Sequence, residues 1–154
     1  MDYEAILIPT DGSKASQKAV PHGLDLAAKH GASVHVLFVV DTDGVDLFLG
    51  KRQLEGLKAG RFGEVGEVKE KARRALRQVV EKAEAQGLEV EKAILAGSPP
   101  ERIVNYASRK GCDVIVMASH GSAGFRRVIL GSVTEKVLRK ATIPVMVINH
   151  KSGD

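Results

Sequence analysis

The chain has 154 residues, of which 44% are hydrophobic and 27% charged, and its formal net charge is +4. These fractions are typical of an ordinary globular protein and argue against general disorder and against a membrane protein. No apolar stretch approaches the roughly 18 residues of a transmembrane helix, and the start, with Asp2 and Glu4, is acidic where a signal peptide would be basic. We therefore expect a single soluble, cytoplasmic domain over 1–150, followed by a short tail over 151–154.

The positive charge does not predict a nucleic-acid-binding protein. The 23 lysines and arginines are interspersed with 19 acidic residues, and only 4% of the residues are aromatic, so platforms for base stacking are scarce. The densest basic cluster, between Lys69 and Arg77, shares its segment with several glutamates, as a solvated helix face does. The single cysteine, Cys112, excludes an intramolecular disulfide and a cysteine-rich metal site.

Five short runs predict the strands of a sheet. Four of them, 5–8, 34–40, 114–117 and 145–148, are almost entirely apolar. Continuous rather than alternating apolarity indicates strands that are covered on both faces, as in a parallel sheet. The fifth run, 88–95, alternates between polar and apolar residues and suits an edge strand.

Helical patterns lie between these runs. Residues 14–29 predict a first helix that Pro21 should kink or weaken. Residues 66–86 carry apolar side chains at spacings of three and four, which predicts an amphipathic helix that Gly87 ends.

Two later helices begin with a similar signal. Ser98 is followed by two prolines and by Glu101, and Ser132 is followed three residues later by Glu135. Both pairs have the spacing of a capping box, in which the serine side chain caps the helix.

The alternation of strands and helices predicts an α/β fold of three layers, α/β/α, doubly wound around a five-stranded parallel sheet. We expect a flavodoxin-like or Rossmann-like sheet in the order 3-2-1-4-5. Such sheets bind ligands beyond the carboxyl ends of their strands, where the strand order reverses. Residues 41–65 interrupt the alternation with five glycines and predict a long loop or lid, although a plain surface excursion is the alternative.

Three segments should meet at that edge of the sheet. They are 9–13 (Pro-Thr-Asp-Gly-Ser), 39–41 at the end of the second strand, and 118–121 (Ala-Ser-His-Gly), which continues to Gly131 and Ser132. Glycines let the main chain approach a phosphate, and a helix N-terminus adds free N–H donors and partial positive charge. This pattern predicts a phosphate-binding site.

The same motifs resemble the universal stress protein family. The resemblance rests on Pro-Thr-Asp-Gly-Ser after the first strand, on Ser-His-Gly followed after nine residues by Gly-Ser, and on Pro-Val-x-Val at the end, and it runs from Tyr3 to about Asn149. ATP-binding members wrap the triphosphate with three glycines, with two residues between the first and the second, nine residues between the second and the third, and Ser or Thr directly after the third. Here the second and third are Gly121 and Gly131, whereas Ala118 replaces the first. Its methyl group obstructs binding only if the position needs a positive φ or very close contact.

The resemblance implies an adenine nucleotide, ATP with Mg²⁺, at this edge. Asp11 would accept hydrogen bonds from the ribose or adenine side, and Pro9 and Val39 would contact the base. Ser132 would offer its N–H to phosphate and cap its helix. The other residues of the implied site are Thr10, Met117, Ala118, Ser119, His120, Gly121, Ser122, Gly124, Gly131, Val133 and Thr134.

Some of these residues have a purely structural alternative. Asp11 could cap the first helix, and Val39 would be apolar in any buried strand. For His120, a hydrogen bond within the loop is favoured over catalysis or metal binding, because no second histidine or carboxylate lies beside it at ligand spacing.

The expected function is that of a cytoplasmic stress-response or regulatory protein that signals through its bound nucleotide. The chain has no Walker-type Gly-Lys-Ser/Thr and no nucleophile elbow, so at most slow ATP hydrolysis is expected. One alternative is a nucleotide-free, dimeric partner-binding module in which Ala118 marks a lost site. A phosphohydrolase with Asp11 as nucleophile is disfavoured, because Ser13 stands where a second acidic residue would be needed.

The last strand also predicts an assembly. The apolar run from Pro144 to Ile148 should lie at an edge of the sheet, where unpaired N–H and C=O groups invite another strand. Pairing with its own copy would give a two-fold homodimer, which the family resemblance also implies.

Overall fold

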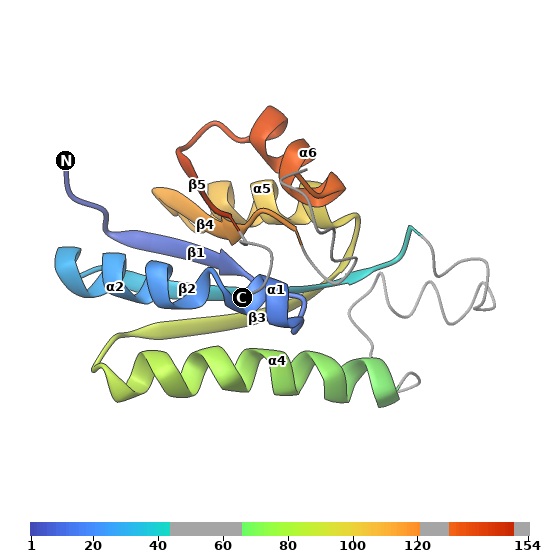
Figure 1. The fold of residues 1–154 in the computed structure, drawn as a ribbon, viewed down its shortest axis with the longest axis horizontal. Coiled ribbons are helices and arrows are strands. Elements are labelled where there is room, and N and C mark those ends of the chain that lie inside the picture. Colours follow the sequence, from blue (N-terminus) through green and yellow to red (C-terminus); the bar gives the residue numbers. More distant parts are fainter. Residues whose placement is uncertain (44–65, 121–129, 150–154) are drawn as a thin grey trace.

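The computed structural model describes residues 1–43, 66–120 and 130–149 (Figure 1). Their strands form one five-stranded sheet in the order β3-β2-β1-β4-β5, and each pair of neighbouring strands is parallel. This confirms the predicted fold class and strand order. The strands are β1 (Ala5–Pro9), β2 (Ser33–Asp41), β3 (Val90–Gly97), β4 (Val114–Ala118) and β5 (Val145–Ile148).

Helices cover both faces of the sheet. They are α1 (Lys14–Gln17), α2 (Val20–His30), α4 (Gly66–Ala85), α5 (Pro99–Arg109) and α6 (Ser132–Lys140). In Figure 1, α4 runs below the strands, and α5 and α6 lie above them. The lid predicted over 41–65 begins at the last residue of β2, and its remainder from 44 onward lies outside the described residues. Among the residues that the structure describes, no helix is long and apolar enough to cross a membrane.

Two apolar cores hold these layers together, one on each face of the sheet. Side chains of successive strand residues point to opposite faces, so each buried strand contributes to both cores. The α2/α4 core contains Ile8, Val36, Val116 and Ala118 from the sheet with Leu24 and Leu76 from the helices. The α5/α6 core contains Leu7, Leu37, Ile115 and Met117 from the sheet with Ile103 and Val137 from the helices.

At one point α2 approaches the sheet especially closely. A Cβ atom on Gly23 would lie 2.5 Å from Cδ1 of Ile8 and 3.6 Å from Cβ of Val116. Glycine is thus the residue that lets α2 lie directly on β1. The helix interior ordinarily disfavours glycine, and here close packing offsets that cost.

The first helical segment differs from the prediction of one kinked helix. It is divided into α1 and α2, with Lys18 and Ala19 between them, and Pro21 is the second residue of α2. Proline fits the first turn of a helix because no intrahelical acceptor awaits its missing N–H. Pro21 therefore marks the start of a helix rather than a kink within one.

The predicted side-chain caps are absent from both later helices, although Ser98 is the N-cap residue of α5, as predicted. Ser98 precedes α5, but its side chain makes no capping hydrogen bond. For α6 the N-cap is Gly131, and Ser132 is already the first helical residue. The Gly131 carbonyl accepts the Glu135 N–H at 3.0 Å, so the helix starts one residue earlier than the capping pattern predicted.

The strand β5 also departs from its prediction. It lies at an edge of the sheet, as expected, but it is not covered on both faces: its residues are half-buried and Met146 is 39% exposed. The apolar sequence of β5 is therefore not explained by burial within this one chain.

Candidate functional site

The predicted segments meet at the carboxyl edge of the sheet. The Thr10 N–H after β1 donates to the Leu37 carbonyl of β2 at 2.9 Å, and the Ser119 N–H after β4 donates to the Ile148 carbonyl of β5 at 2.9 Å. From β1 the chain turns to α1 and α2 on one face, and from β4 it leads to α6 on the other face. This is the reversal of winding at which doubly wound sheets bind ligands.

The loop after β1 is held rigidly by its own side chains. Thr10 is buried, and its Oγ1 accepts the Gly12 N–H at 3.1 Å and lies 3.2 Å from Oγ of Ser16. Asp11 Oδ1 accepts the Ser13 N–H at 2.9 Å. The loop therefore fixes Asp11 at the tip of β1, with its backbone polar groups satisfied locally.

The cap of α1 is Ser13 and not Asp11. The Ser13 Oγ accepts the Ser16 N–H at 3.1 Å, as an N-cap side chain does. The interpretation of Asp11 as the cap of the first helix is therefore wrong. Gly12 has a φ of +81°, and a Cβ there would lie 3.1 Å from Cβ of Ala75, so the loop also packs closely on α4.

Ala118, which replaces the first glycine of the motif, has an ordinary strand backbone. It ends β4, and among the described residues no residue other than glycine has a positive φ. Its side chain is 7% exposed and belongs to the α2/α4 core. Its carbonyl accepts the Thr134 hydroxyl at 2.9 Å. Of the two possibilities for its methyl group, packing in the core or crowding the edge, the structure shows the first.

The start of α6 packs directly against Ser119 and His120, the two residues that follow β4. The Gly131 N–H donates to the Ser119 carbonyl at 2.7 Å. A Cβ on Gly131 would lie 3.1 Å from Cα of His120, closer than nine in ten real contacts of this kind. The φ of −63° at Gly131 is open to any residue, so backbone conformation does not require glycine here. The close approach of the two backbones does.

His120 is buried within this junction. It is 3% exposed, and its Nδ1 lies 3.1 Å from Oγ of Ser119, itself 2% exposed. In the described parts of the chain, no group of three or more His, Cys, Asp and Glu side chains could hold a metal ion. His120 thus makes the hydrogen bond within the loop that the sequence favoured.

The first turn of α6 presents backbone donors at this edge. The first N–H groups of an α-helix have no intrahelical acceptor, and they carry the positive end of the helix dipole. Ser132 is exposed and Val133 half-buried, whereas the Thr134 hydroxyl is turned inward to Ala118. The Thr134 hydroxyl is therefore already used within the protein, whereas Ser132 and Val133 begin the helix nearer the surface.

The apolar residues of the predicted site, which are Pro9 and Val39 at the base and Met117, lie on adjacent strands. Val39 and Met117 both belong to the α5/α6 core, and the buried Pro9 ends the strand between them. Val39 is half-buried and Met117 nearly fully buried. The structure therefore brings all three to one region. Gly121, Ser122 and Gly124 lie outside the described residues.

The comparison with known proteins decides the family. The family model of the universal stress protein family matches residues 2–149. The chain belongs to this family. A similar protein, the universal stress protein MJ0531 of Methanocaldococcus jannaschii, is 38% identical over 148 residues, which cover 95% of this chain and 82% of the relative.

Solved universal stress proteins have the same fold as this chain. A structure of MJ0577, also from Methanocaldococcus jannaschii, has a TM-score of 0.80 at 29% identity and covers 99% of this chain and 100% of that one. A universal stress protein from Archaeoglobus fulgidus in complex with dAMP has a TM-score of 0.69 at 23% identity and covers 96% of this chain and 99% of that one.

Among the described residues of this universal stress protein, the clear pKa shifts lie near the other, amino end of the sheet. His35 is buried near the amino end of β2, and burial lowers its pKa. Burial raises the pKa of Tyr106 to about 12 and that of the Cys112 thiol to about 11. Cys112 is therefore protonated near neutral pH and a poor nucleophile.

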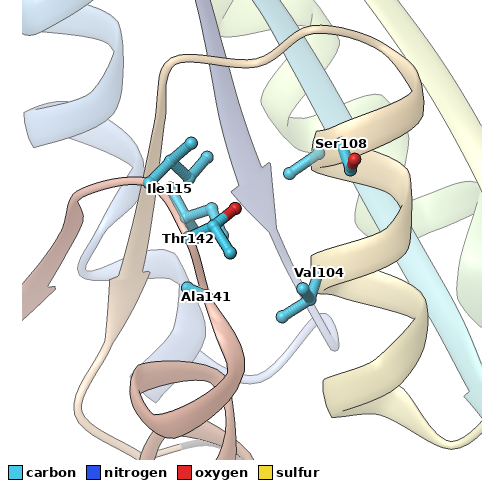
Figure 2. A pocket seen from close by; sticks show the side chains of 7 residues that line it. Val104, Ser108, Ile115, Ala141 and Thr142 are labelled. Atoms are coloured by element: carbon cyan, nitrogen blue, oxygen red, sulfur yellow. The ribbon is translucent and has the colours of Figure 1, made fainter.

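A small pocket of this universal stress protein is also remote from the carboxyl edge. Figure 2 shows it between α5 and the segment that leads from α6 to β5, with Val104 and Ser108 facing Ala141 and Thr142. Its lining is Val104, Ala107, Ser108, Ile115, Ala141, Thr142 and Ile143, which includes none of the predicted site residues and no charged group. The candidate site remains the carboxyl edge.

Sequence reasoning missed one charged residue of the universal stress protein at that edge. Arg102 lies in the first turn of α5, next to the end of β3. The available signal was Gly97, which ends β3 directly before the Ser-Pro-Pro turn. No local pattern, however, indicates that this glycine packs against the Arg102 side chain.

Proposed function

We propose that this universal stress protein binds an adenine nucleotide, ATP with Mg²⁺, at the carboxyl edge of its sheet, and acts in stress response or regulation through its bound state. The observation that carries the proposal is the seating of Gly131 on His120. It fixes the positive end of α6 beside the end of β4, so that the N–H groups of Ser132 and Val133 form an anion site.

The altered glycine does not argue against this proposal. Ala118 needs no positive φ, and its methyl group packs away in the α2/α4 core. The phosphates would then approach along the backbone of Ser119 and His120 and the start of α6. A phosphate path that runs along the backbone, away from the Ala118 methyl group in the α2/α4 core, does not need a glycine at position 118.

The roles of the other residues follow from their places. Asp11, fixed by its Ser13 hydrogen bond, would accept hydrogen bonds from the ribose or adenine side. Pro9 and Val39 would contact the base, and Met117 would line the site at the end of β4. Mg²⁺ retains water and binds through few carboxylates and the substrate phosphates, so it would not require a cluster of three or more metal ligands, which the described residues lack.

Solved relatives that carry nucleotides support this ligand class only in general terms. The relative from Archaeoglobus fulgidus is in complex with dAMP, and another solved universal stress protein is in complex with cAMP. At 23% and 21% identity, these likenesses show the fold alone. Our proposal for this chain therefore depends on its own loop geometry. The cytoplasmic location of this protein stays a prediction.

Mass spectrometry of small molecules released from freshly purified protein tests the proposal. We expect an adenine nucleotide at about one per subunit, and calorimetric titration of the stripped protein should then show ATP binding. Asp11→Ala should weaken that binding, because the carboxylate would lose its hydrogen bonds to the nucleotide. If neither ATP, ADP, AMP nor cAMP binds at millimolar concentration, the nucleotide-free partner module replaces our proposal.

A specific observation also favours a homodimer. The edge strand β5 is apolar yet half-exposed, with Met146 39% exposed, and its outer N–H and C=O groups face no other strand of the described sheet. We propose that β5, with Pro144, pairs with its copy around a two-fold axis, which would cover both the edge and its side chains.

A further inference from the structure

The end of β3 is built around a contact between a glycine and an arginine. Gly97 is buried and has a φ of +146°, a conformation that residues with a side chain rarely adopt. A Cβ atom on Gly97 would lie 2.6 Å from Nε of Arg102 and 3.2 Å from its Cγ. The arginine side chain therefore lies flat across the glycine backbone, and any other residue at 97 would displace it.

The backbone of α5 holds Arg102 in this position. Its N–H donates to the Ser98 carbonyl at 3.0 Å, within the first turn of the helix. The side chain is half-buried, so its stem is packed while its charged end stays near the surface. A side chain fixed in this way has little rotamer entropy left to lose on binding a ligand.

Sheet register places Arg102 beside the proposed base contact. Gly97 pairs with Asp41, and Leu95 pairs with Val39 two residues earlier. Side chains two residues apart on a strand point to the same face, so Arg102 lies on the face that carries Val39 and Leu95 in the α5/α6 core. One strand spacing combined with two residues of rise separates Gly97 from Val39 by about 8 Å.

The charge of Arg102 has no ion-pair partner among the residues that the structure describes. Asp41, which pairs with Gly97 across the strands, accepts the Asp43 N–H at 2.9 Å through Oδ1. A half-buried guanidinium usually has a carboxylate, a phosphate or an aromatic face as its partner.

We infer that Arg102 is a further binding residue of the nucleotide site, and that its guanidinium stacks on the purine base. This inference rests on the proposed function. With the phosphates at the start of α6 beside β4, the base lies toward β2 and β3, about three strand spacings or 14 Å away. At that distance Arg102 contacts the base rather than the phosphates, whereas β4 and α6 provide the phosphate contacts.

Calorimetric titration of the full chain with ATP and with inorganic triphosphate tests this role. In Arg102→Met, the long apolar side chain still covers Gly97, but the planar cation is lost. We expect its ATP affinity to fall roughly tenfold and its triphosphate affinity to stay unchanged. Arg102→Lys keeps the charge without the plane, so we expect a similar fall.

The matched control is Arg109→Met, the same exchange at the opposite end of α5, which should bind both ligands like the wild type. Circular dichroism should show that all variants are folded. ATP affinity unchanged in Arg102→Met, an equal loss for triphosphate, or full rescue by Arg102→Lys would each overturn the inference. Failure of the proposed function looks different, because the wild type itself would then bind no adenine nucleotide, and both proposals would fall.

Discussion

The hydroxyl of Tyr106 and the Nδ1 atom of His35 lie 2.9 Å apart in the interior of the protein. The two rings meet edge to face with their centroids 5.7 Å apart, which joins α5 to β2 near the amino end of the sheet. Glu91 Oε2 lies 3.6 Å from the same Nδ1, and Glu91 Oε1 binds Lys110 Nζ at 3.0 Å. These four polar side chains, of Tyr106, His35, Glu91 and Lys110, thus form one connected group that extends from the α5/α6 core to the surface.

This arrangement predicts a pH-dependent stability. Burial lowers the pKa of His35 below its ordinary value of 6.5, with Glu91 opposing and Lys110 supporting the shift. The unfolded chain therefore takes up the proton first, and stability that is fully present above pH 6.5 is lost as the pH falls toward the lowered pKa. Urea unfolding between about pH 7.5 and 5.5 should show the decline.

Two variants assign that decline to His35. In His35→Gln the slope of unfolding free energy against pH should flatten, because the group that titrates is gone. His22→Gln, on the exposed face of α2, is the matched control and should keep the slope of the wild type. If His35→Gln declines as steeply as the wild type, another group carries the pH dependence.

Local sequence patterns predicted the strands of this fold well because the sheet is sandwiched between two cores. The runs that became β1 and β4 are continuously apolar, and every residue in both strands is buried. The run that became β5 has the same pattern but lies at the sheet edge, half-exposed. Sequence periodicity reports what a strand can bury and does not reveal what covers it.

The contacts that shape the site were harder to predict, because they join residues that are distant in sequence. His35 is one polar residue inside an apolar run, and its partner Tyr106 follows 71 residues later. Gly131 was predicted only as a residue that touches phosphate. Its contact with the backbone of His120 depends on how α6 approaches β4, which no local pattern encodes.

That contact predicts the effect of a small side chain at the start of α6. In Gly131→Ala the new Cβ would lie 3.1 Å from Cα of His120 and 3.3 Å from the Ser119 carbonyl oxygen, so α6 must shift outward. We expect a loss of about 1–3 kcal/mol in unfolding free energy and weaker ATP binding, since the helix donors move with the backbone. Urea unfolding and calorimetry measure the two effects.

The matched control for this change is Gly66→Ala. Gly66 begins α4, and a Cβ there would meet nothing within 4 Å. This variant should be as stable as the wild type or slightly more stable, because alanine favours the helix. A Gly131→Ala protein with wild-type stability and ATP affinity would remove the junction from the proposed site.

The edge strand gives a prediction about assembly. Val147 lies in the middle of β5, where the proposed two-fold pairing would bring two copies together, so Val147→Arg places like charges at the interface. We expect the wild type to sediment as a dimer at micromolar concentration and the variant to shift toward monomer. Lys140→Arg, on exposed α6, changes no charge and should leave the dimer intact. A monomeric wild type contradicts the proposed pairing.

The last prediction concerns Ala118, where the chain departs from the motif of the ATP-binding members. Because its methyl group is buried in the α2/α4 core, Ala118→Gly removes apolar contacts and adds backbone freedom in a strand. Together these should lower the unfolding free energy by about 1.5 kcal/mol and Tm by roughly 3–6 °C. ATP affinity should be preserved or rise only slightly, because the wild-type backbone already has a conformation that alanine accepts and the methyl group packs in the core.

Ala5→Gly is the matched control for Ala118→Gly, since it makes the same change in a buried residue at the amino end of β1, away from the proposed site. It should lose stability without any change in ATP affinity, which separates the effect of core packing from that of the phosphate path. A large gain in affinity confined to Ala118→Gly would show that the methyl group does obstruct the nucleotide, contrary to its place in the core. If wild type and Ala118→Gly both bind no adenine nucleotide, the alanine is not the obstacle, and a partner-binding module is the better account of this edge.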